Sequence, residues 1–196
     1  MADDLDGSYG AFVRAHADAV YSTALRLSSS RADADDIAQE TFVRAYRALR
    51  RYDRARVVAL QARPWLLTIT VNLWRSAGRG AARRPRTAGT GPAETADPRP
   101  GPEEAALSSE ASRSLVRLLA ELPEHHRVPL VLHHVVGLTY PEVASVLGCP
   151  VGTAKANAAR GLARLRDLAR TTAPRPTSPV PRPPSPARRA VAKEAP

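Results

Sequence analysis

The sequence predicts an all-α protein with two small helical domains, an N-terminal helical bundle and a C-terminal helix-turn-helix. Apolar residues recur at helical spacing within residues 9–79 and within residues 110–169. Residues 80–109 and 171–196 lack this periodicity and are rich in proline and arginine, so we expect a flexible linker and a disordered basic tail. Residues 139–166 then read as a capped helix, a glycine turn and a second helix.

The composition favours a polyanionic partner. The 196 residues carry a formal net charge of +10, which suits nucleic acid or an acidic surface. No apolar run approaches the roughly 20 residues that a membrane-spanning helix needs, and the acidic start at Asp3 and Asp4 is unlike a signal peptide. The single cysteine, Cys149, permits neither an internal disulfide nor a cysteine-based zinc cluster and is expected to be a small apolar filler. We therefore expect a cytoplasmic protein without membrane insertion.

The first two predicted helices cover residues 9–28 and 33–49. The first carries apolar residues such as Phe12 and Leu27 on one side and ends at a run of three serines. The second begins with acidic residues, which suit the positive end of the helix dipole, and has an apolar stripe that includes Ile37. From the pattern alone, a charged face opposite such a stripe is usually solvated. The members of this face are Asp33, Asp36, Gln39, Glu40 and Arg44.

Residues 52–63 interrupt the helical pattern, and a third helix is expected to start with Pro64 in its first turn. Trp65 is expected in the core, whereas the position of Trp74 is left open. Basic side chains beside aromatic rings can hold a nucleic-acid backbone while bases stack. The arginines concerned are Arg54, Arg56 and Arg63 in the interruption, then Arg75 and Arg79 at the end of the helix.

The C-terminal block holds the most informative motif. Thr139 and Glu142 have the spacing of a capping box, and Gly148 stands where a left-handed helix end belongs. The second helix of the motif would place a basic face toward solvent, and such a helix can enter a DNA major groove. The solvent-side residues are Thr153, Lys155, Asn157, Arg160 and Arg164. The alternative is an ordinary helical hairpin with a solvated basic face.

Three further residues of this block carry expectations. Pro129 lies inside an expected helix and predicts a kink or a later helix start. His126 and His133 fall on one side of a helix, but without a third ligand they are expected to be packing or surface histidines. Neither block contains a phosphate-binding glycine loop or a nucleophile beside a base. We therefore expect no enzyme activity, no metal and no cofactor.

These motifs, in this order, resemble the two conserved regions of bacterial sigma factors of the extracytoplasmic-function group. Residues 33–46 resemble the family's polymerase-binding segment, and residues 64–73 resemble the helix that reads the −10 element. The runs 122–132, 137–144 and 152–155 resemble its −35-reading module. The resemblance covers both helical blocks.

The resemblance implies a role for each candidate residue. The charged face of the second helix would dock on the clamp of the largest subunit of RNA polymerase, and the C-terminal block would lie near the flap. Residues 52–63, with Arg54, Arg56 and Arg63, would hold an extruded −10 base, and Asn72, Arg75 and Arg79 would contact the adjacent DNA. The second helix of the helix-turn-helix would read the −35 element. An anti-sigma factor is a further partner that the resemblance implies.

One departure from the family pattern carries its own prediction. The family often has Val-Lys-Ser-Arg in the recognition helix, whereas this chain has Ala154, Lys155, Ala156 and Asn157. An amide in place of a guanidinium suits adenine rather than guanine. We therefore expect a −35 element that differs from the commonest one in the family.

The resulting interpretation is a transcription initiation factor that binds core RNA polymerase and promoter DNA. Two alternatives belong to other classes. A stand-alone helix-turn-helix regulator would bind DNA without polymerase, and a basic RNA-binding or scaffold protein would give residues 33–49 no special role. Retention of core polymerase by the chain distinguishes the three.

Overall fold

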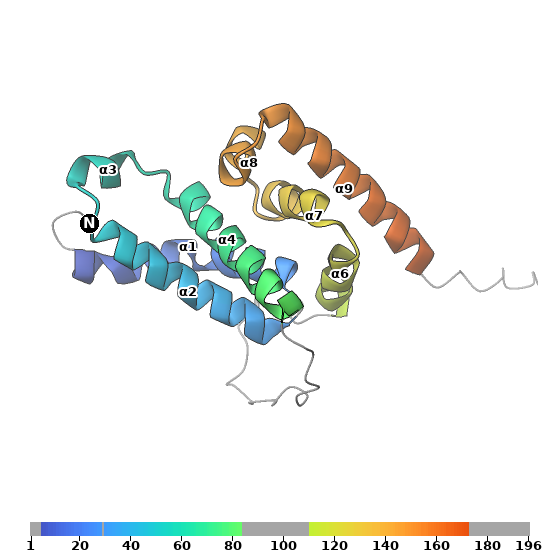
Figure 1. The fold of residues 1–196 in the computed structure, drawn as a ribbon, viewed down its shortest axis with the longest axis horizontal. Helices are drawn as coiled ribbons and strands as arrows, with labels where there is room; N and C mark the ends of the chain where they lie inside the picture. Colours follow the sequence, from blue (N-terminus) through green and yellow to red (C-terminus); the bar gives the residue numbers. More distant parts are fainter. Residues whose placement is uncertain (1–4, 29, 84–109, 173–196) are drawn as a thin grey trace, which may run out of the picture.

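The computed structural model describes residues 5–28, 30–83 and 110–172, and within these residues it contains α-helices, one π turn and no strand (Figure 1). The all-α prediction is therefore confirmed. We call residues 5–83 the first block and residues 110–172 the second block. The expected linker from residue 84 onward and the expected tail from residue 173 onward lie outside the described residues.

The first block consists of α1 (Leu5–Leu27), α2 (Arg31–Leu49), α3 (Arg54–Ala59) and α4 (Ala62–Arg83). Helices α1, α2 and α4 pack against one another. Several of their contact positions are alanines with no exposed surface, Ala24, Ala34 and Ala45. Small side chains at the crossings allow helix axes to approach closely, and larger residues such as Leu66 fill the spaces beside them.

The first block differs from the sequence-based expectation in several places, and α1 and α2 already begin two to four residues earlier than expected. A short helix, α3, lies inside the interruption expected over residues 52–63, because Asp53 caps it: its Oδ1 accepts a hydrogen bond from the Arg56 amide at 2.8 Å. Helix α4 starts at Ala62 and extends to Arg83, which is four residues into the segment where we expected the linker to begin.

The second block consists of α6 (Glu110–Ala120), α7 (Glu124–Leu130), the π turn η1 (Val131–Val135), α8 (Tyr140–Leu147) and α9 (Val151–Thr172). The capping box is confirmed, since the Thr139 amide donates to Glu142 Oε2 at 2.7 Å and the Thr139 hydroxyl accepts from the Glu142 amide. Gly148 ends α8 with φ 63°, the left-handed value that glycine adopts most easily. The helix-turn-helix is therefore present as predicted.

Pro129 does not interrupt its helix sharply. Helix α7 runs through Pro129, which is buried, and then widens into η1, where the Val136 amide donates to the Val131 carbonyl at 3.1 Å. Proline cannot donate a main-chain hydrogen bond, and π turns, although rare, occur mostly as single widened turns inside α-helices. The expected kink therefore takes the form of a widened turn just after the proline.

The two blocks share one hydrophobic core, which the sequence did not predict. Leu27 of α1 and Leu67 and Val71 of α4 belong to the same buried cluster as Leu119 and Val128 of the second block. Figure 1 shows α4 next to α8, and contacts also join α1 to α6 and α1 to η1. The described helices therefore form one packed unit in this structure.

Candidate nucleic-acid and protein interfaces

The charged face of α2 lies on the side of that helix away from the core. Asp33, Asp36 and Gln39 are exposed, and Arg44 Nε lies 2.7 Å from Glu40 Oε1 with both side chains about half exposed. Such an exposed i,i+4 pair is worth only a few tenths of a kcal/mol, about 0.3–0.5. The structure therefore brings all five candidate residues to one accessible surface. A partner that binds there can replace the Glu40–Arg44 pair at small energetic cost.

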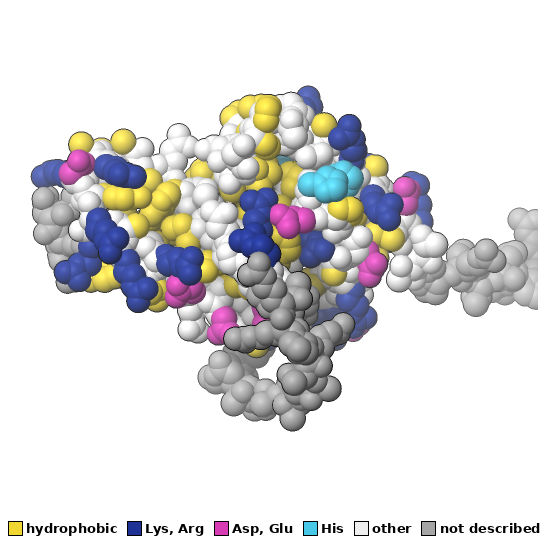
Figure 2. All heavy atoms as spheres, in the orientation of Figure 1, with side chains coloured by type: hydrophobic (Ala, Val, Ile, Leu, Met, Phe, Trp, Pro, Cys, Tyr) yellow, Lys and Arg dark blue, Asp and Glu magenta, His cyan; other side chains and the backbone are white. Residues whose placement is uncertain are grey.

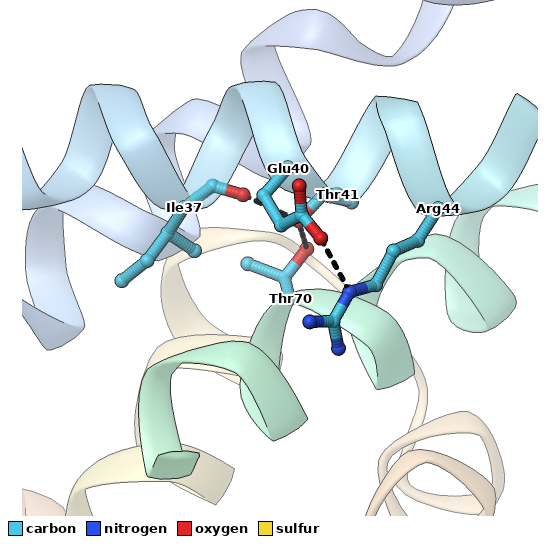
Figure 3. A network of polar contacts seen from close by, with 5 residues as sticks. All are labelled: Ile37, Glu40, Thr41, Arg44 and Thr70. Carbon is cyan, nitrogen blue, oxygen red and sulfur yellow. Dashed lines mark hydrogen bonds and ion pairs between the residues drawn. The ribbon is translucent and has the colours of Figure 1, made fainter. Parts of the chain in front are cut away.

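A buried hydroxyl pair fixes this surface relative to α4 (Figure 3). Thr41 Oγ1 donates to the Ile37 carbonyl at 2.7 Å, Thr70 Oγ1 donates to the Leu66 carbonyl at 3.0 Å, and the two hydroxyl oxygens lie 3.3 Å apart. Each hydroxyl has a single hydrogen, which it already donates to a carbonyl of its own helix. The hydroxyl–hydroxyl contact between the helices is therefore weaker than these two bonds. Figure 3 shows this contact between α2 and α4 next to the Glu40–Arg44 pair.

Arginines gather around α3 at one end of the molecule. Arg54 and Arg56 are exposed, and the Arg56 guanidinium lies 3.9 Å from the centre of the Tyr52 ring. The Tyr52 ring in turn lies 6.1 Å from the half-buried Trp65. Figure 2 shows the dark blue Lys and Arg spheres over this end, close to exposed apolar surface. Cations beside aromatic rings can hold a phosphate backbone and a stacked base together.

The remaining candidates on the first block lie along α4. Asn72, Arg75 and Arg79 recur at helical spacing on one face, and Asn72 and Arg79 are exposed. Arg75 is different, because its Nε pairs with Glu124 Oε1 of the second block at 2.7 Å and its side chain keeps only 28% of its surface. Arg63, at the start of α4, also reaches the second block and donates to the Val136 carbonyl. Two of the candidate arginines are therefore engaged within the chain.

The candidates on α9 do not form a single cluster. Successive residues of a helix are rotated by about 100°, which places Thr153, Asn157, Arg160 and Arg164 within one narrow arc. Arg160 Nη1 donates to Asn157 Oδ1 at 3.5 Å. Lys155 lies about 160° around the axis from Asn157 on the same arithmetic. Lys155 is exposed as expected, but it lies on the opposite flank of the helix from the other four candidates.

Glycine sets the position of α9 against α7. A Cβ at Gly161 would lie 2.8 Å from the carbonyl oxygen of His126, closer than such contacts occur. Ala154 and Ala158, on the same side of α9, are fully buried. This close crossing holds the face of Arg160 and Arg164 in a fixed orientation to the rest of the block.

His133 has structural partners, whereas the buried Nδ1 of His126 has no hydrogen-bond partner among the described residues. The Nδ1 atom of His133 lies 2.7 Å from the Leu138 carbonyl, and its ring stacks on Tyr140 with centres 4.0 Å apart. Burial and the neighbouring His125, Arg160 and Arg164 lower the pKa of His126. The described residues contain no group of three or more His, Cys, Asp or Glu side chains that could hold a metal ion. None of the described helices is both long and apolar enough to cross a membrane.

Sequence reasoning missed Arg127, although its contacts join the two blocks. Its guanidinium donates to three carbonyls, those of Leu27 at 3.3 Å, Ala120 at 2.7 Å and Leu122 at 3.0 Å. It also lies 5.7 Å from the centre of the Trp74 ring. The only available signal was a charged residue directly before the apolar run from Val128 onward.

Known proteins match this chain over both blocks. A model of Sigma-70 region 2 matches residues 12–84, and a model of Sigma-70, region 4 matches residues 112–165. The ECF RNA polymerase sigma factor SigE of Mycolicibacterium smegmatis is 35% identical over 165 residues, which cover 82% of this chain and 61% of that protein. The ECF RNA polymerase sigma-E factor of Escherichia coli is 32% identical over 133 residues, which cover 63% and 66%. This chain therefore spans less than two thirds of the length of either relative.

Solved structures show the same fold. CnrH in complex with the cytosolic domain of CnrY superposes with a TM-score of 0.65 at 26% identity, covering 88% of this chain and 94% of CnrH. The sigma factor RpoE of Bartonella quintana, in complex with the anti-sigma factor NepR, gives a TM-score of 0.64 at 21% identity and covers 84% and 98%. At that identity the second match supports the fold alone.

Proposed function

Because this chain belongs to the extracytoplasmic-function group of bacterial RNA polymerase sigma factors, we propose that it binds core RNA polymerase and directs promoter recognition, local DNA melting and transcription initiation. One observation carries the proposal: sigma-70 regions 2 and 4 occur in one chain and in that order. RNA synthesis is then the chemistry of the polymerase, and this chain contributes binding and no catalytic step of its own. Its working compartment would be the cytoplasm, where the polymerase acts.

The polymerase would bind the charged face of α2. The surface formed by Asp33, Asp36, Gln39, Glu40 and Arg44 is accessible, and the Thr41–Thr70 contact joins the same helix to α4. A surface of mixed charge gives a partner both attraction and register, since wrong pairings place like charges together. We assign its partner as the clamp of the largest polymerase subunit.

Melted −10 DNA would bind along α3 and α4. Arg56 lies over the Tyr52 ring, whose centre is 6.1 Å from that of Trp65, and Arg54 is exposed on the same short helix. Aromatic rings beside cations suit an unpaired base beside its phosphate. Asn72, Arg75 and Arg79 continue the same path on α4, and Arg63 stands at its start. Removing a base from the stack costs a few kcal/mol, which is offset by stacking and pocket hydrogen bonds.

The −35 duplex would bind α9. Thr153, Asn157, Arg160 and Arg164 share one arc of the helix, so they can reach the same strand of a major groove. Lys155, on the other flank of the helix, would contact a backbone phosphate across the groove. Asn157 can form a bidentate pair with adenine. We therefore keep the proposal that the −35 element differs from the commonest one of the family.

A protein of the anti-sigma class is a further proposed partner. The solved structures that match contain CnrY with CnrH, and NepR with the Bartonella quintana factor. A stand-alone helix-turn-helix regulator is the alternative function, but it does not explain why residues 12–84 match Sigma-70 region 2.

Transcription with purified components tests the proposed function. The full chain, added to a bacterial core polymerase free of sigma factor, should give run-off product from a promoter selected with the same holoenzyme. The variant Asp36→Lys with Glu40→Lys should lose retention of core polymerase. The matched control, Glu110→Lys with Asp167→Lys, makes the same charge change at exposed positions outside this surface and should retain polymerase. No run-off product with the unmodified chain would refute the proposal.

A further inference from the structure

Four basic side chains from α7 and α9 gather where these two helices cross. The crossing is close at Gly161, because a Cβ there would lie 2.8 Å from the His126 carbonyl oxygen. Arg160 precedes this glycine and Arg164 follows it within one turn, so both lie beside the crossing. Figure 2 shows cyan histidine spheres over α7 with dark blue spheres next to them. We call His125, His126, Arg160 and Arg164 the basic cluster.

The basic cluster has no carboxylate of its own. The acids next to it in sequence are engaged elsewhere: Glu124 pairs with Arg75 at 2.7 Å, and Asp167 lies 3.7 Å from Arg170. Among the described residues, neither arginine of the cluster forms an ion pair with a carboxylate. Because like charges repel one another, an anion bound there would stabilise the arrangement.

The turn η1 also packs against α7 and carries two further histidines. Nδ1 of His133 lies 2.7 Å from the Leu138 carbonyl, and the charges that act on His134 are those of His133 and Arg166. Neither histidine is among the groups that act on His126. The basic cluster itself therefore sets the electrostatic surroundings of His126.

His126 is the buried titratable member of the basic cluster. Burial, and then the neighbouring His125, Arg160 and Arg164, lower its pKa, so the ring stays neutral to a lower pH than a free histidine. Its Nδ1 is buried and has no hydrogen-bond partner in the part of the chain that the structure describes. Nearly all buried polar atoms of native proteins are hydrogen-bonded, and a bound ion is among the usual reasons for an exception.

The basic cluster lies beyond the part of α9 that would read bases. In helix-turn-helix proteins the first turns of the recognition helix contact base edges. Arg164 follows Asn157 by seven residues, which is about 10 Å further along the helix axis, where the DNA backbone is the surface within reach. A backbone phosphate has the charge and the oxygen acceptors for charge-assisted hydrogen bonds from arginine and protonated histidine.

We propose that the basic cluster binds a backbone phosphate of the −35 duplex and that His126 takes up a proton when this phosphate binds. This inference rests on the proposed function of α9. An anion beside the ring stabilises its charged form, so the complex binds more protons than the free chain. Affinity for the duplex therefore rises as the pH falls through the range in which His126 of the complex becomes protonated.

Promoter binding by holoenzyme measures this coupling. Core polymerase reconstituted with the full chain is titrated with a duplex that carries the −35 element of the promoter selected as above, at pH 8 and at pH 6. The gain in affinity at pH 6 should be about three- to tenfold larger for the unmodified chain than for His126→Gln, since a pKa shift of one unit corresponds to a factor of ten. His125→Gln, at an exposed position where the fold is little affected, should lose part of the gain. The control His134→Gln changes an exposed histidine outside the cluster and should keep all of it.

The dependence of binding on salt separates a phosphate contact from a structural role. At pH 6, His126→Gln should reduce the slope of log affinity against log salt concentration by about 1, because one phosphate contact is lost. At pH 8 the variant and the unmodified chain should have the same slope. Loss of the pH gain without this change in slope would assign His126 a structural role and overturn the phosphate site.

Two other results would also overturn the phosphate site: an unchanged pH gain in His126→Gln, or an equal loss in His134→Gln. Both leave run-off transcription at pH 8 intact. Absence of run-off product would instead refute the proposed function, and this inference with it.

Discussion

The two helices proposed to read promoter DNA, α4 and α9, differ in how much of their basic face the rest of the chain occupies. On α4, Arg75 and the nearby Arg63 are bound by the second block. On α9, Arg160 and Arg164 are exposed, and Arg160 donates a hydrogen bond to Asn157 of the same helix. Arginine side chains of the first block are thus bound by the second block, whereas those of α9 have no contact of this kind with the first block among the described residues. Packing between blocks, rather than residue type, decides which face is available.

The largest expected effect concerns whether the two blocks unfold as one unit. Leu66 and Leu67 are adjacent and fully buried, but Leu66 packs within the first block and Leu67 packs in the shared core. Each change to alanine should lower the free energy of unfolding by about 2–5 kcal/mol. Only Leu67→Ala should also separate the unfolding curve seen by tryptophan fluorescence from the curve seen by far-ultraviolet circular dichroism. Trp65 packs within the first block, whereas Trp74 also borders the shared core, so the fluorescence is measured in a Trp74→Phe background that leaves Trp65 as the reporter of the first block.

Coincident curves for Leu67→Ala, or separated curves for the unmodified protein, would contradict this expectation. The first result would mean that the shared core is not what joins the blocks. The second would mean that the blocks unfold independently even when the core is intact.

A second prediction concerns the packing of α9 against α7 at Gly161. A valine at Gly161 would force α9 away from the His126 carbonyl and should lower the free energy of unfolding by about 1–3 kcal/mol. The control Gly152→Ala lies on the same helix with nothing within 4 Å of the added Cβ and should leave stability unchanged or slightly raised. Urea titration measures both. An equal loss in the two variants would show that helix propensity, not the close crossing, determines the effect.

A third prediction concerns base choice by α9. Asn157→Arg should move the preferred base at one −35 position from adenine to guanine, with a discrimination of about 1–3 kcal/mol. Binding-site selection with holoenzyme measures the change. Lys155→Ala provides the contrast, because a residue on the other flank should weaken binding to all sequences alike. A shift in base preference with Lys155→Ala instead would reverse the two assignments.

The smallest effect concerns acid and the start of α8. Two hydrogen bonds from Thr139 lower the pKa of Glu142, so its contribution is complete above the unfolded-state value of 4.5 and is lost as the pH falls through the lowered value. Glu142→Gln should cost about 1 kcal/mol or less at pH 7, and less at pH 3. Thermal unfolding at both pH values measures the difference; an equal cost at pH 3 would contradict the titration.

Local features of this fold could be predicted from the sequence because their causes are local. The capping box at Thr139 and the left-handed Gly148 depend on residues within one or two turns. The short helix α3 was missed although its cap, Asp53, is visible in the sequence. The position of Lys155 could also have been derived, since helical rotation alone separates it from Asn157.

Contacts between the blocks could not be predicted in this way. Arg63 and Val136 are 73 positions apart, and Arg127 and Leu27 are 100 positions apart. No periodicity connects such residues, and their acceptors are main-chain carbonyls that have no sequence signal at all. The residue roles assigned to the α2, α4 and α9 faces stay predictions until the experiments above are done.

The acceptors of Arg127 have a consequence for how this chain tolerates mutation. Every residue supplies a carbonyl, so replacement of Leu27, Ala120 or Leu122 by another amino acid leaves each acceptor chemically in place. The hydrogen-bonding chemistry of this contact is therefore carried by one side chain, that of Arg127. Leu27 and Leu122 matter to it only through the core packing that holds their carbonyls in place.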